Sequence, residues 1–296
     1  MLLRQALVEG RPALTAELTP PRGGETSAAM VAAAALRGRV HAVNVTDGSR
    51  AVMGMSSMAL CRLLLDHGIE PVFQLTCRDR NRIALQAELL GAHALGIPNV
   101  LCLTGDPVKA GDQPAAKSVF DFESVRLLRQ VRALNAGLDP GGDGRRLPHG
   151  PIDLLPGCAA DPQSGSWDGL KRRTQRKCEA GARFAQTQMV TDREALRRFC
   201  GEIAGPLGLP VLAGVFLLKS ARNAAFINRV VPGAKIPQHT IDRLAAAPDP
   251  GAEGVRIAAE QVREFLGIAQ GVHLMAIKAE ALVPRILDLA GIAAIA

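Results

Sequence analysis

The sequence predicts an α/β protein folded as a single (β/α)8 barrel, the TIM barrel, and three observations carry this prediction. Short apolar runs alternate with longer amphipathic runs along the chain, and about eight such units can be counted. Strands that alternate with helices form a parallel sheet, and eight units on one chain favour its closure. The 296 residues also suit this class, because barrels of about 250 residues fold as one domain. We therefore expect residues 1–296 to form one domain.

The strands are expected where short runs of Val, Ile, Leu, Ala and Phe are bounded by turn residues. In the first of them a Pro-Pro pair and a Gly-Gly pair follow the run and end it. The predicted strands cover residues 13–18, 40–46, 72–76, 99–103, 152–158, 184–190, 210–216 and 271–277.

The helices are expected between these strands, where amphipathic or Ala-rich runs have good helix propensity. Gly91 provides a stop signal for one of them, and Asp192 is an expected N-cap of another. A Gly/Pro-rich stretch at 139–151 is predicted to be a surface insertion, because the β-α alternation resumes beyond it. The predicted helices cover residues 26–37, 54–67, 79–91, 122–135, 167–180, 192–203, 220–229 and 253–266, with one more at the C-terminal end.

A doubly wound open sheet is the alternative fold. Such a sheet normally carries a glycine-rich dinucleotide motif after its first strand. Here the segment 19–24 reads T-P-P-R-G-G, which lacks the G-x-G-x-x-G pattern. The sequence also lacks a P-loop, a Gly-x-Ser-x-Gly motif and a His-Glu-x-x-His motif.

The composition argues against nucleic acid and membrane as partners. Aromatic residues make up 3% of the chain, too few for a base-stacking surface. The net charge is +7, but Lys and Arg are scattered. Their densest run, at 171–177, is typical of a solvated helix face, although positive charge also attracts anionic substrates. No apolar window of 18 residues is free of charge, and 1–9 does not have the pattern of a signal peptide.

The six cysteines have no C-x-x-C or zinc-type spacing. We therefore expect reduced thiols, a cytoplasmic location and no metal.

In a barrel, polar residues that directly follow a strand reach the active-site mouth. Each of them has an ordinary structural alternative: Glu17 could bind a core Arg or backbone amides, and Asp106 could cap a turn. Gln188 could be a satisfied core amide, and His273 a structural strand residue. For Glu17 we favour function, because burial disfavours a charged carboxylate, and a carboxyl that keeps its proton can act as a general acid. The candidate mouth residues are Glu17, Asn44, Thr46, Asp47, Gln74, Thr76, Thr104, Gly105, Asp106, Asp161, Gln163, Gln186, Gln188, Lys219, His273 and Lys278.

Several short motifs occur in a particular order along the chain. They are E-x-x-P-P-R from Glu17, V-T at 45–46, L-T-C at 75–77, L-T-G-D-P at 103–107, K-C-E-A-G-A at 177–182, T-Q at 187–188 and G-V-H at 271–273. In this order the chain resembles the methylenetetrahydrofolate reductases over nearly its full length. The resemblance implies reduction of 5,10-methylenetetrahydrofolate to 5-methyltetrahydrofolate by NADH or NADPH through a bound flavin, FAD.

The resemblance also implies residue roles. Glu17 would be the general acid that opens the folate to its iminium form, and Asp106 would stabilise that cation beside the flavin. Thr46 would contact the flavin ring. The other cofactor residues would be Asp47, Gln74, Thr76, Thr104, Gly105, Asp161 and Lys177, and the folate residues would be Gln188, Lys219 and His273.

Some positions depart from the family pattern. Thr104 replaces an Arg, Gln74 replaces a His, and Asp47 and Ala221 stand where aromatic residues are common. The segment 157–161 lacks the family's Tyr and His. Three hypotheses stay open: an FAD- or FMN-dependent reductase, a flavin-free reductase with direct hydride transfer, and a folate-binding partner subunit with little activity alone. The chain could also form a homo-oligomer.

Overall fold

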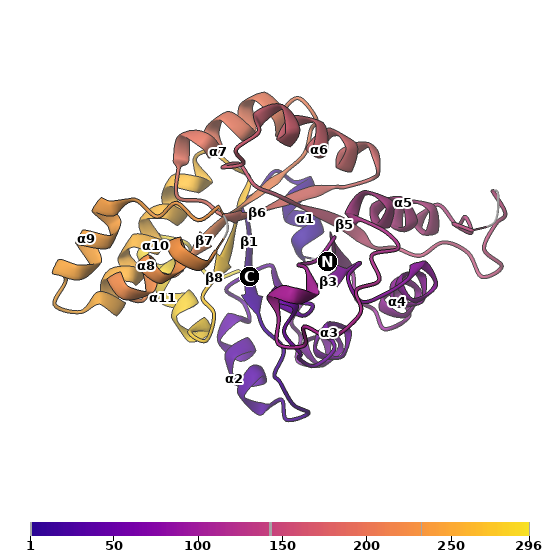
Figure 1. Cartoon of the computed structure of the whole chain (residues 1–296), viewed down its shortest axis with the longest axis horizontal. Helices are drawn as coiled ribbons and strands as arrows, with labels where there is room; N and C mark the ends of the chain where they lie inside the picture. The colour runs from indigo at the N-terminus through magenta and orange to yellow at the C-terminus, as the bar shows by residue number, and fades with distance from the viewer. Residues whose placement is uncertain (1, 142–143, 232, 296) are drawn as a thin grey trace.

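A computed structural model describes residues 2–141, 144–231 and 233–295. Eight parallel strands form a closed barrel in which each strand pairs with the next and β8 pairs with β1. Figure 1 shows the helices arranged around these central strands. The predicted TIM barrel is confirmed. The strands are β1 (Ala13–Leu18), β2 (Ala42–Val45), β3 (Pro71–Thr76), β4 (Asn99–Leu103), β5 (Leu155–Ala160), β6 (Phe184–Met189), β7 (Val211–Phe216) and β8 (Gly271–Met275).

The helices lie close to their predicted positions, with two additions, α1 and α9. The α-helices are α1 (Leu2–Val8), α2 (Ser27–Leu36), α3 (Ser57–Asp66), α4 (Arg82–Ala94), α5 (Ser124–Asn135), α6 (Trp167–Glu179), α7 (Arg193–Phe199), α8 (Ala221–Val230), α9 (Gln238–Ala246), α10 (Pro250–Leu266) and α11 (Val283–Leu289). Short helical turns are η1 (Ser49–Ala51), η2 (Val108–Ala110), η3 (Cys200–Ala204) and η4 (Glu280–Leu282). Among the described residues, no helix is long and apolar enough to cross a bilayer.

Helix α1 closes the N-terminal end of the barrel. Its buried Leu3 and Leu7 belong to one apolar cluster with residues at the starts of the strands, including Ala13 and Phe184. The Phe184 ring occupies the space inside the barrel beside Gly157, where an added Cβ would lie 2.2 Å from the ring. This end of the barrel is therefore packed with apolar side chains, which leaves the C-terminal end of the strands for chemistry.

Alternation along β1 separates the outer core from the barrel interior. Leu14 and Leu18 join the large apolar cluster that the helices cover. Ala13 belongs to the inner cluster with α1. Because side chains alternate along a strand, Thr15 and Glu17 share the inward face with Ala13.

One predicted strand begins in the wrong place. Residues 152–154 precede β5 instead of forming part of it. The Asn135 side chain donates to the Leu154 carbonyl at 2.8 Å and accepts its N–H at 3.1 Å. The Asn135 side chain therefore supplies the backbone hydrogen bonds that a neighbouring strand would otherwise supply to this segment. In the Gly/Pro-rich stretch just before it, Leu138 pairs with Arg146, and residues 142–143 of the predicted insertion lie outside the described residues.

Candidate active site

Hydrogen-bonded amides cross the middle of the barrel. Asn44 Nδ2 on β2 donates to Gln186 Oε1 on β6 at 2.8 Å. Gln74 Nε2 on β3 donates to Asn44 Oδ1 at 3.3 Å. All three side chains are buried. The part of the barrel interior that these three side chains occupy is therefore polar but uncharged.

Glu17 lies near the C-terminal end of β1, beside β8. The residue is partly buried and its side chain is 14% exposed. Its Oε2 lies 3.6 Å from Nε2 of His273, which is fully buried on β8. The imidazole Nδ1 in turn lies 3.0 Å from the hydroxyl of Thr15. Among the described residues, no Lys or Arg forms an ion pair with Glu17, and a mostly buried carboxyl without such a partner can act as a general acid.

Asp106 follows β4 on an exposed loop that is tied to the loop after β2. Its Oδ2 accepts the backbone N–H of Arg50 at 2.9 Å. The preceding Gly105 has φ +96, and a Cβ there would lie 3.0 Å from Arg78 and 3.1 Å from Thr76. Glycine is therefore required at the turn that sets the direction of Asp106.

A second carboxylate strengthens the same connection between loops. Asp112 accepts the N–H of Met53 at 3.0 Å and pairs with Arg22 at 2.5 Å. The Met53 N–H, followed by the Arg22 guanidinium, holds the pKa of Asp112 below its ordinary value. The loops after β1, β2 and β4 thus meet at the mouth through carboxylate contacts.

Asp47 and Thr76, two predicted cofactor residues, bind each other. Asp47 Oδ2 accepts both the N–H and the hydroxyl of Thr76 at 2.9 Å. It also pairs with Arg80 at 2.7 Å. By contrast, the hydroxyl of Thr46 is buried without a hydrogen-bond partner. Of these three residues, Thr46 is the one whose side-chain oxygen has no hydrogen-bond partner.

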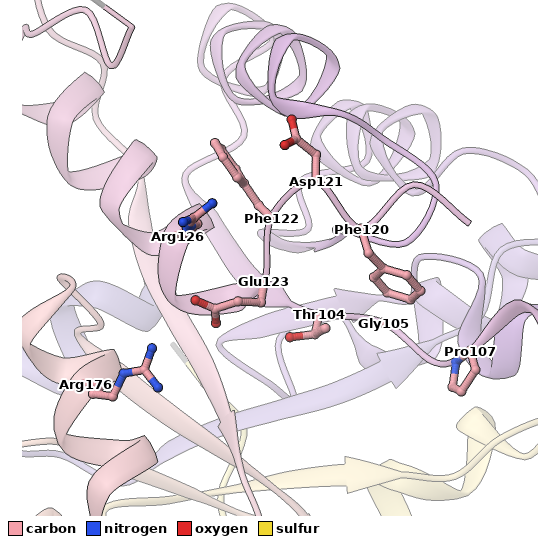
Figure 2. Close-up of a pocket in the computed structure, with 9 residues that line it drawn as sticks. All are labelled: Thr104, Gly105, Pro107, Phe120, Asp121, Phe122, Glu123, Arg126 and Arg176. Atoms are coloured by element: carbon pink, nitrogen blue, oxygen red, sulfur yellow. The ribbon is translucent and has the colours of Figure 1, made fainter. Parts of the chain in front are cut away.

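A cavity of about 640 Å³ opens beside the loop after β4 (Figure 2). It lies against the first turn of α5 and reaches the exposed Arg176 on α6. Thr104, one of its walls, accepts the N–H of Ser124 at 3.2 Å. Of the predicted site residues, Thr104 and Gly105 line this cavity, whereas Glu17 does not. The lining consists of Thr104, Gly105, Pro107, Phe120, Asp121, Phe122, Glu123, Arg126 and Arg176.

The side chains of three further predicted residues make contacts within the protein. Asp161 Oδ1 accepts the N–H of Gln163 at 3.0 Å, within its own loop. Lys177 donates to the Ala159 carbonyl at 2.7 Å. Lys219 donates to the Ile277 carbonyl at 2.6 Å and so connects the loops after β7 and β8. Of these contacts, that of Lys219 joins two loops at the rim of the barrel.

Two other candidates lie at opposite extremes of exposure. Gln188 is exposed within an irregular stretch of β6, where the pairing with β7 shifts register between Gln186 and Met189. His273 is completely buried, so it lies behind Glu17 and does not reach the surface of the mouth. Burial thus argues against direct substrate contact by His273.

The family model for methylenetetrahydrofolate reductase matches residues 2–291. The chain belongs to the methylenetetrahydrofolate reductase family. It is similar to methylenetetrahydrofolate reductase 1 of Schizosaccharomyces pombe, with 26% identity over 269 residues, 86% of this chain and 41% of the relative. It is similar also to a probable methylenetetrahydrofolate reductase (NADPH) of Caenorhabditis elegans, with 26% identity, 80% of this chain and 35% of the relative. The chain thus spans about two fifths of the length of these relatives.

A solved structure of similar fold is an uncharacterized Clostridium thermocellum protein that binds two copies of 5-methyl-5,6,7,8-tetrahydrofolic acid. It superposes with a TM-score of 0.67 at 14% identity, over 96% of this chain and 98% of that one. At this identity the likeness shows a shared barrel fold.

Several residues near the strand ends were not predicted from the sequence, among them Arg126 of the cavity, Thr15 and Arg78. Thr15 contacts His273, and alternation on β1, two residues before Glu17, was the signal that could have found it. Arg78 is buried and donates to the Gly48 carbonyl at 2.9 Å. Its position two residues after Thr76 was the comparable signal, although its contact with the loop after β2 depends on the fold.

Proposed function

We propose that this chain reduces 5,10-methylenetetrahydrofolate to 5-methyltetrahydrofolate with electrons from NADH or NADPH. Membership of the family supports the reaction. The observation that carries the proposal is the Glu17 carboxyl, partly buried at the C-terminal end of β1 with His273 as its ionisable neighbour. An acid of this kind is what opening of the folate's methylene bridge requires.

In this proposal Glu17 donates its proton to N10 of the folate, the nitrogen that leaves the methylene carbon, so that the methylene group stays on N5. The C–N bond breaks, and the methylene group remains on the other nitrogen as a cationic iminium. A hydride then adds to the iminium carbon and gives the methyl group. The chain's own contribution is the proton and a site that favours positive charge.

Asp106 is the residue proposed to stabilise this cation. One of its oxygens holds the Arg50 N–H at 2.9 Å, and the side chain is exposed at the mouth. A fixed carboxylate stabilises a developing cation without further reorganisation. Gln188 and Lys219, both exposed near the ends of β6 and β7, are the proposed contacts for the polar groups of the folate.

The residues fit a bound flavin at two places. The unpartnered Thr46 hydroxyl offers a hydrogen bond to a ring, and the cavity beside Thr104 and Gly105 offers Arg126 and Arg176 to phosphate groups. When bound, the flavin would carry the hydride from the nicotinamide to the folate. The remaining contribution of these residues is to bind and orient the cofactor.

A second candidate function is reduction of the same substrate by direct hydride transfer from the nicotinamide. It is favoured by the number of proposed cofactor residues that already have partners within the protein. Asp47 pairs with Arg80, Gln74 with Asn44, and Lys177 with a backbone carbonyl. A flavin would have to compete for these groups.

One experiment tests the function and separates the two routes. The purified chain is assayed anaerobically with methylenetetrahydrofolate and nicotinamide deuterated at C4, and its absorbance spectrum is recorded. We expect a flavin absorbance band and oxidation of the nicotinamide before folate is added. Deuterium transfer into the methyl group by a colourless protein would support the direct route instead. Tight folate binding without any turnover would refute the proposal and indicate a binding subunit.

A further inference from the structure

A completely buried imidazole stands behind Glu17 with one nitrogen unpartnered. His273 Nδ1 lies 3.0 Å from the Thr15 hydroxyl, whereas Nε2 has no hydrogen bond. Nε2 faces Glu17 Oε2 at 3.6 Å, just beyond hydrogen-bond length. A buried polar atom without a partner costs free energy. A small rotation of the Glu17 carboxyl would satisfy it.

We infer that Thr15 and His273 form a positioning pair that holds the Glu17 carboxyl and keeps its proton in place until the substrate takes it. This inference rests on the function proposed above. It gives His273 a role behind the acid, in place of the folate contact that the sequence suggested.

The surroundings of the pair favour a neutral imidazole. In the barrel register His273 lies beside Thr15 on β1 and Gly214 on β7. Glu17 lies beside Asn44 on β2. None of these neighbours is charged, and within the described parts of the chain Glu17 is the one ionisable group that His273 meets. An imidazolium at a fully buried position would lack both water and a second counter-charge.

A neutral imidazole has one N–H and one lone pair, so its tautomer decides what Glu17 meets. With the proton on Nδ1, the N–H donates to Thr15 Oγ1, and the Nε2 lone pair accepts the proton of the Glu17 acid. In the opposite tautomer a mostly buried carboxylate would depend on one N–H at 3.6 Å. A buried carboxylate needs several donors, so the first arrangement leaves fewer groups unsatisfied.

The tautomer can be measured without any turnover. The chain contains six histidines, and ring ¹⁵N labelling with NMR distinguishes the two neutral tautomers from the imidazolium. The His273 signals are identified by their loss in His273→Gln. We expect a neutral ring with its proton on Nδ1 at pH 7 in the substrate-free protein. A proton on Nε2, or a charged ring, would overturn the inference.

The second test is the pH profile of kcat for folate reduction. In Thr15→Val the Nδ1–H loses its acceptor, so the Nε2–H tautomer gains and stabilises the Glu17 carboxylate. We expect the alkaline fall of kcat to move about one pH unit lower, with KM little changed, and Thr15→Ser to restore the parent profile. A folded Thr15→Val with the parent profile would contradict the inference. Absence of turnover in the parent would instead refute the proposed function, and the NMR measurement would still test the pair.

Discussion

The Asp106 carboxylate accepts the backbone N–H of Arg50 at 2.9 Å and so joins the loop after β4 to the loop after β2. Arg50 and the next residue, Ala51, have φ values of 57 and 56. Such left-handed conformations cost a residue other than glycine about 1 kcal/mol or more. Asp106 therefore helps to hold a strained turn at the rim of the barrel, and its side chain remains exposed.

Replacement of Asp106 separates these two roles. Asp106→Asn keeps an oxygen that can accept the Arg50 N–H but loses the negative charge. We expect folate reduction to slow by about 10²-fold, with the thermal midpoint nearly unchanged. Asp106→Ala should show the same loss of rate together with faster proteolysis of the 49–53 segment. Equal rates for Asp106→Asn and the parent would show that the charge is not used.

The pair of Asp47 and Arg80 is predicted to act mainly on stability. Their side chains are 9% and 17% exposed, so removal of Arg80 leaves a nearly buried carboxylate. We expect Arg80→Ala to lower the free energy of unfolding by about 3 kcal/mol in urea titrations. The matched control is Arg62→Ala, which removes the exposed pair with Asp66 and should cost about 0.5 kcal/mol. Similar losses in both variants would contradict the buried role of Arg80.

His41 should make the protein sensitive to mild acid. Its Nδ1 accepts the Leu14 N–H at 3.0 Å, and burial, aided by Arg11, lowers the pKa of His41 below its ordinary value of 6.5. Below its ordinary pKa of 6.5, His41 binds a proton more readily in the unfolded chain than in the folded one. The stabilisation that neutral His41 gives the folded protein is therefore present above pH 6.5 and is lost as the pH falls below it.

The test is the free energy of unfolding of the parent and of His41→Asn at pH 7.5 and 5.5. Asn keeps an acceptor near the Leu14 N–H but does not titrate. The drop in stability between the two pH values should therefore be smaller in the variant than in the parent. The exposed His67 supplies the control, since His67→Asn should retain the parent's drop. An equal drop in all three proteins would exclude His41 as the acid-sensitive group.

Local pattern was sufficient for much of the fold. The predicted ranges 13–18 and 99–103 coincide with β1 and β4, because a buried strand bounded by turn residues is visible in a short window. Helices α1 and α9 were not predicted. Each is short, and its helical form depends on packing against the rest of the protein. Helix α1 packs against the N-terminal end of the barrel, and α9 packs in a small apolar cluster with Ala224 and Ile227 of α8.

Site residues were predictable individually but not in their pairings. Position at or just after the end of a strand was enough to place Glu17, Thr46 and Asp106 near the C-terminal ends of β1, β2 and β4. The contact between Thr15 and His273 joins residues 258 positions apart, and that between Asn44 and Gln186 joins residues 142 apart. Such pairings follow from barrel closure and register, which a single sequence does not specify.

The most direct test of the account is Glu17→Gln, assayed in two half reactions. The amide keeps the size and polarity of the side chain but cannot donate an acid proton. We predict that folate reduction slows by about 10²-fold or more, while nicotinamide oxidation with an artificial acceptor stays near the parent rate. Folate reduction at the parent rate by a folded Glu17→Gln variant would contradict the assignment of Glu17 as the general acid.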